Sequence, residues 1–89
     1  MIEKKLEIVN KLGLHLRAVA LLVQTASRYK AEIEIRKDRQ IVDAKSIMGL
    51  MSLAASHGSK ITLRCKGKDE QEAVLAIAAI VANKFGEGS

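Results

Sequence analysis

Apolar and polar residues alternate along several stretches of the chain, a pattern typical of half-buried β-strands. The alternation is clearest over residues 2–8, 31–36 and 60–66. A short apolar run at 41–43 follows the polar turn at 37–40 and predicts one further strand. We therefore expect four strands, each with one face turned to the core.

Between these stretches the apolar residues recur every three or four positions, which predicts amphipathic helices. One such helix covers about a dozen residues from Leu16 onward. A dense apolar cluster after Ser46 predicts a short second helix with that serine as its N-cap. A longer helix begins after an acidic variant of the capping box, formed by Asp69 and Glu72, and Gly86 is expected to end it.

The predicted order of elements is βαββαβα, which places the chain in the α+β class. Strands that are apolar on alternate positions only have one face for the core and one for water. We expect an open-faced β-sandwich, with a four-stranded antiparallel sheet covered on one face by three helices. Residues 1–89 would form a single domain.

Composition limits which cellular compartment the protein occupies and which kinds of partner it binds. The chain is 48% hydrophobic but only 2% aromatic, so its core must be aliphatic. A single cysteine, Cys65, excludes an internal disulfide and fits a reducing compartment, and no run approaches the roughly 20 apolar residues of a membrane span. We expect a cytoplasmic protein without direct membrane insertion. Its formal net charge of +5 favours acidic or phosphorylated partners and permits nucleic acid.

One histidine stands where the first strand gives way to the first helix, in Gly13-Leu14-His15-Leu16-Arg17. Unpaired N–H groups at a helix N-terminus favour a neutral, nucleophilic imidazole and hold an anion nearby. Arg17 adds a planar fork that suits phosphate. The pattern predicts a histidine that receives a phosphoryl group. The plain alternative is a surface histidine beside a solvated arginine.

Three segments together resemble the HPr family, the histidine-containing phosphocarriers of the bacterial sugar phosphotransferase system. They are residues 13–17, 21–27 and 45–53, and the similarity extends over nearly the whole chain. The resemblance implies that His15 accepts a phosphoryl group on Nδ1 from phosphorylated enzyme I, which takes it from phosphoenolpyruvate. His15 would then pass it to the A domain of an enzyme II, with Arg17 stabilising the phosphate. It implies a relay carrier rather than an enzyme, without cofactor or metal, that acts as a monomer.

The same resemblance implies regulation at Ser46, which a dedicated HPr kinase/phosphorylase would phosphorylate. A phosphate there would reduce phosphoryl uptake through like-charge repulsion against acidic partners. Flexible methionines suit a surface that binds several proteins. Partner docking is expected on the first two helices, at Leu16, Ala20, Ile47, Met48, Leu50 and Met51.

Two residues depart from the family pattern and keep other functions open. Relatives usually carry proline where this chain has Ala18, and a small residue where it has Leu16. These changes favour a regulatory or nitrogen-branch paralogue as an alternative. A small basic nucleic-acid-binding domain is a second alternative. It lacks stacking platforms, since neither Tyr29 nor Phe85 lies on a predicted strand and sheet-based readers use strand aromatics.

Overall fold

The computed structural model describes all residues from 1 to 89 and confirms four strands and three helices in the predicted order. The strands are β1 (Ile2–Glu7), β2 (Glu32–Lys37), β3 (Gln40–Asp43) and β4 (Lys60–Lys66). The helices are α1 (Leu16–Ala26), α2 (Ile47–Ser52) and α3 (Glu70–Ala82), and a short 3₁₀ turn, η1 (Lys84–Gly86), follows α3.

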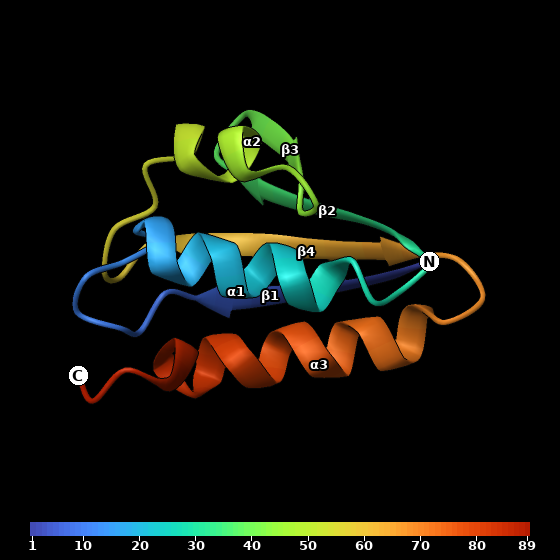
Figure 1. Cartoon of the computed structure of the whole chain (residues 1–89). Coiled ribbons are helices and arrows are strands. Elements are labelled where there is room, and N and C mark those ends of the chain that lie inside the picture. The colour runs from blue at the N-terminus through green and yellow to red at the C-terminus, as the bar shows by residue number, and fades with distance from the viewer.

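The strands form one antiparallel sheet in the order β1-β4-β2-β3. Every second residue of β4, namely Ile61, Leu63 and Cys65, is buried beneath the helices. Figure 1 shows the three helices on one side of this sheet. On the other side Arg64 forms ion pairs with Glu3 at 3.2 Å and Glu34 at 3.7 Å. The predicted open-faced sandwich is confirmed.

The core between sheet and helices is aliphatic apart from one ring. Its fully buried large side chains come from the strands, the helices and the connection after β1. They include Ile8, Leu22, Ile33, Ile35, Leu50, Leu63 and Ile77. Phe85, only 7% exposed, is the one aromatic residue of the core and anchors the chain after α3.

The long last helix ends earlier than predicted. It stops at Ala82 rather than at Gly86, because Lys84 and Phe85 adopt left-handed backbone angles, with φ of 57° and 54°. That conformation costs a non-glycine residue about 1–2 kcal/mol, and burial of Phe85 offsets part of it. The turn sends residues 87–89 back across the molecule, where the Lys11 N–H donates to the Ser89 carbonyl at 3.1 Å. Figure 1 shows the C-terminus at the same end as the loop between β1 and α1.

The predicted capping box at the start of α3 is wrong. Asp69 is the N-cap residue, but its side chain makes no capping bond. Its carboxylate instead accepts the backbone N–H groups of Lys30 and Ala31, both at 2.9 Å. The Lys30 bond is the largest cause that lowers the pKa of Asp69. The carboxylate therefore fastens the segment after α1 to the start of α3.

Candidate functional site

His15 is the N-cap residue of α1, with an extended backbone (φ −77°, ψ 173°), and its side chain makes no capping bond. The first hydrogen bond of the helix runs from the Val19 N–H to the His15 carbonyl at 2.9 Å. The N–H groups of residues 16–18 consequently lack a carbonyl partner. Together with the helix dipole, they form a site of positive potential beside the ring.

Gly13 shapes the loop that presents the histidine. Its φ is +69°, a region that favours glycine, and the loop passes close to the segment before β4. The Leu14 N–H donates to the Ala55 carbonyl at 2.8 Å. A Cβ at position 13 would lie 2.7 Å from that oxygen and 2.8 Å from Cα of Ser56. The close approach of two backbones therefore needs glycine and fixes where α1 begins.

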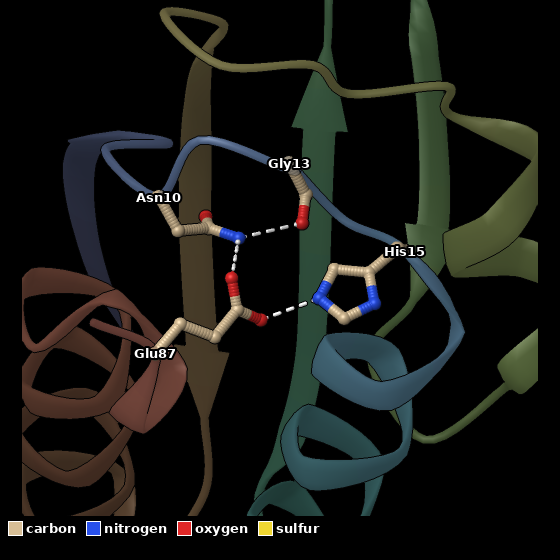
Figure 2. A network of polar contacts seen from close by, with 4 residues as sticks. All are labelled: Asn10, Gly13, His15 and Glu87. Carbon is tan, nitrogen blue, oxygen red and sulfur yellow. Dashed lines mark hydrogen bonds and ion pairs between the residues drawn. The ribbon is translucent and has the colours of Figure 1, made fainter. Parts of the chain in front are cut away.

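The ring of His15 contacts one residue that the sequence did not single out, Glu87, and a second, Asn10, contacts Glu87 in turn. The Nε2 atom of the ring contacts a carboxylate oxygen of Glu87. The other carboxylate oxygen accepts from Nδ2 of Asn10 at 3.0 Å, and the same Nδ2 donates to the Gly13 carbonyl at 2.7 Å. Figure 2 shows this chain of contacts, which joins the loop after β1 to the tail after η1.

No sequence motif pointed to Asn10 or Glu87. Asn10 belongs to the polar break after the first strand, where asparagine is common. Glu87 lies among small and polar residues beyond the last helix, without a motif of its own. The one available sign is that left-handed turns after a helix can reverse the chain, and glycine at position 86 marks such a turn.

The electrostatics of the cluster are dominated by the histidine–carboxylate contact. The pKa of Glu87 is lowered first by its bond to His15, then by the bond from Asn10, with a further contribution from the charge of Arg17. The side chain of Glu87 is 17% exposed and that of His15 30%. Glu87 is therefore a carboxylate at neutral pH.

His15 and Arg17 lie together on an open depression of about 590 Å³. Arg17 is exposed and has no ion-pair partner within 4.0 Å, so its guanidinium is free to meet an anion. The lining residues are Leu12, His15, Leu16, Arg17, Ala20 and Glu87. Two predicted docking residues, Leu16 and Ala20, are among them and therefore line the same depression as the ring.

Ser46 is the N-cap of α2, as predicted, and its Oγ accepts the Gly49 N–H at 3.1 Å. Around it, Ile47, Met48 and Met51 are 46%, 83% and 42% exposed, which suits their predicted docking role. Leu50 is different: it is fully buried, because the inner face of this short helix packs on the core. Its prediction as a docking residue is therefore wrong.

The remaining side chains bear on three other kinds of site: a metal site, a membrane span and a base-stacking surface. The structure brings together no group of three His, Cys, Asp or Glu residues that could hold a metal ion. No helix is both long and apolar enough to cross a membrane. The strands carry no aromatic side chain, since Tyr29 follows α1 and Phe85 is buried in η1, so the open sheet face has no platform for stacking bases.

Comparison with known proteins gives a consistent result. The family described as "PTS HPr component phosphorylation site" matches residues 2–83. Phosphocarrier protein HPr of Cupriavidus necator is 50% identical over 88 residues, which cover 99% of each chain. The HPr-like protein Crh of Halalkalibacterium halodurans is 54% identical over 81 residues, 91% of this chain and 96% of that one.

Solved structures agree with the sequence relatives. The crystal structure of HPr-C-His from Thermoanaerobacter tengcongensis superposes with a TM-score of 0.97, at 48% identity and full coverage of both chains. A crystal structure of an HPr dimer from the same organism gives a TM-score of 0.79 at 49% identity, covering 98% of this chain and 100% of that one.

Proposed function

The chain belongs to the HPr family of phosphocarrier proteins, and from this premise we propose that His15 relays a phosphoryl group between two partner proteins. In this proposal phosphorylated enzyme I, charged by phosphoenolpyruvate, donates the group. The A domain of an enzyme II receives it and so drives sugar uptake. The protein is a carrier, phosphorylated only in transit.

One observation carries the proposal: a histidine occupies the N-cap position of a helix whose first three N–H groups have no carbonyl partner. Phosphoryl transfer through a loose transition state needs alignment and charge stabilisation more than covalent chemistry. The N–H groups and the free guanidinium of Arg17 supply that stabilisation without binding the phosphate covalently. A phosphorylated imidazole leaves as a neutral ring, so the group stays transferable.

The direct test is incubation with phosphoenolpyruvate and a bacterial enzyme I. We expect an acid-labile phosphate on the wild-type protein and none on His15→Ala. His57→Ala is the matched control, because His57 is an exposed loop histidine and its loss should leave labelling unchanged. Labelling that persists without His15, or that needs His57, would assign the phosphate to another residue.

The second part of the proposal is regulation at Ser46. Its position before an exposed apolar surface puts any added phosphate beside the predicted docking residues of α2. Two further negative charges there would repel acidic partners while leaving the helix N-terminus stabilised. An HPr kinase with ATP should give an acid-stable phosphate that is absent from Ser46→Ala and slows labelling of His15. Unchanged His15 labelling after complete serine phosphorylation would remove the regulatory role.

The proposed docking surface comprises Leu16, Ala20, Ile47, Met48 and Met51. Met48→Asp tests it most simply, because this side chain is 83% exposed and contributes little to folding. We expect a higher KM for enzyme I with little change in the free energy of unfolding. An unchanged KM would place docking elsewhere.

A regulatory paralogue is the alternative favoured by one finding, the 54% identity to an HPr-like protein Crh. A paralogue of this kind would take phosphate on Ser46 but pass little from His15 to sugar-specific acceptors. The two functions are distinguished by offering the labelled protein to several enzyme II A domains, including nitrogen-branch ones.

We propose that the protein acts as a monomer, although one similar HPr forms a dimer. Sedimentation during turnover tests this oligomeric state.

A further inference from the structure

The contacts of the His15 ring distinguish its two nitrogens. Nε2 meets the Glu87 carboxylate, whereas Nδ1 points away from it and has no hydrogen-bond partner in the protein (Figure 2). A carboxylate only accepts hydrogen bonds, so the proton of the neutral ring lies on Nε2. The lone pair needed for attack on phosphorus is then on Nδ1, the nitrogen that Glu87 leaves free.

From this arrangement we infer that Glu87 is a positioning residue for phosphoryl transfer: it holds the Nε2 proton of His15, while Asn10 holds Glu87. The inference rests on the proposed function of His15 and adds two residues to it. Neither residue touches the reacting atoms. Glu87 also lies beyond the stretch matched by the family description, which ends at residue 83.

Asn10 links Glu87 to the loop at Gly13, although one of its own side-chain atoms is left without a partner. It is fully buried, and its Nδ2 serves two acceptors, whereas its Oδ1 has no hydrogen-bond partner. A buried carbonyl oxygen without a donor is unfavourable. What the asparagine does achieve is a fixed orientation of the Glu87 carboxylate relative to the loop at Gly13.

The backbone before Glu87 is strained in a way that serves the same end. Lys84 and Phe85 are both left-handed, a conformation that costs a non-glycine residue free energy and persists only where the surrounding structure holds it. Buried Phe85 holds the turn against the core, and the Lys11 N–H bond to the Ser89 carbonyl holds the segment beyond. Glu87 is therefore fixed on both sides and is not a side chain that meets the ring by chance.

The contact has a use in both directions of transfer. When Nδ1 attacks, the N–P bond forms as the bond from phosphorus to the donor breaks, and the donor keeps that electron pair. The ring proton stays on Nε2, so the phosphorylated ring is positively charged and its proton faces the Glu87 carboxylate. On transfer onward the N–P electrons return to Nδ1 and a neutral ring leaves. The imidazole ring neither gains nor loses a proton in either step, as long as the proton stays on Nε2.

The test compares Glu87→Ala and Glu87→Gln with Glu72→Gln, a matched loss of charge at an exposed position of α3. Nitrogen-15 NMR of the unphosphorylated protein, at a pH where the ring is neutral, reports which nitrogen carries the proton. We expect a protected Nε2–H in the wild type and in Glu72→Gln. We expect its loss in Glu87→Ala, and partial retention in Glu87→Gln because an amide oxygen still accepts.

The kinetic test measures phosphoryl transfer from enzyme I with the same proteins. We expect kcat to fall about tenfold in Glu87→Ala, comparable to the smaller losses seen when the carboxylate that orients a metal-binding histidine is removed. The kcat of Glu87→Gln should lie between those of Glu87→Ala and the wild type, and KM should stay near the wild-type value in both variants. A change in KM alone would make Glu87 a docking residue and overturn the inference.

The role of Asn10 is tested with a double mutant. If Asn10 acts through Glu87, Asn10→Ser should lower the activity of the wild-type protein, but it should cause no additional loss in a protein that already carries Glu87→Ala. Additive losses would overturn its role. A wild-type ring protonated on Nδ1 would overturn the whole inference. Failure of the proposed function looks different, since enzyme I would then leave the wild type unlabelled while the NMR result is unaffected.

Discussion

Substitution of Gly13 by alanine should show how much of the site depends on one close approach of two backbones. The new Cβ would lie 2.7 Å from the Ala55 oxygen, the atom that accepts the Leu14 N–H. The left-handed φ of +69° adds about 1–2 kcal/mol, and loss of the buried hydrogen bond adds roughly 1–1.5 kcal/mol. Together we expect a loss of about 2–3.5 kcal/mol in the free energy of unfolding.

Urea denaturation checks this magnitude against a matched variant, Gly58→Ala. Gly58 has a φ of +88°, but an added Cβ there meets no atom within 4 Å, so only the backbone term applies. We expect Gly58→Ala to cost about 1–2 kcal/mol and Gly13→Ala clearly more. For a domain of this size each kcal/mol shifts Tm by about 4–8 °C, which is easily measured. Equal losses in the two variants would refute the steric argument.

The same substitution should reduce activity beyond its effect on folding. The Gly13 carbonyl accepts both the Asn10 amide and the His15 N–H, so a displaced loop moves the ring. At a temperature where Gly13→Ala is fully folded, we expect slower labelling by enzyme I than for Gly58→Ala. Equal rates would mean that the loop recovers its position despite the clash.

Ser46→Ala should lower the free energy of unfolding by about 1 kcal/mol through loss of the Gly49 N–H bond, and Ser46→Thr should restore most of it. The lowered pKa of Asp69 stabilises the fold above its ordinary value of 3.8, and this contribution disappears as the pH falls through the lower folded value. Urea midpoints should therefore fall more steeply below pH 4 in the wild type than in Asp69→Asn. Burial raises the pKa of the Cys65 thiol to about 11, so alkylation at pH 8 should be slow until denaturant is added; rapid reaction of the folded protein would contradict its burial. Ala18→Pro removes an N–H without a carbonyl partner, so we expect α1 to persist and stability to change by no more than about 1 kcal/mol, upward; a loss of stability in urea denaturation would contradict this expectation.

The elements that the sequence predicted well are those whose pattern is local. Alternation over residues 60–66 specifies a half-buried strand wherever that strand lies, and β4 occupies that range. Serine before an apolar cluster likewise predicts a cap, because the bond from the Gly49 N–H spans only three residues. His15 could be placed at a helix start for the same reason.

What could not be predicted depends on contacts between distant segments. The carboxylate of Asp69 could cap its own helix, but it instead accepts the two backbone N–H groups that follow α1. Glu87 reaches His15 only because left-handed residues reverse the chain after α3. Leu50 appeared available for docking because a short apolar helix does not reveal which of its sides faces inward.

The strand order also decides when, during folding, the histidine can find its surroundings. β1 pairs with β4 rather than with its neighbour in sequence, so the first strand has no partner until the middle of the chain has folded back. The loop after β1 cannot take its native conformation until the segment before β4 and the C-terminal residues are in place, because it is hydrogen-bonded to both. Chains dominated by such non-local pairings fold in milliseconds to seconds rather than microseconds. In rapid-mixing experiments the ring of His15 should therefore reach its native environment together with the sheet, and not with the faster formation of α1.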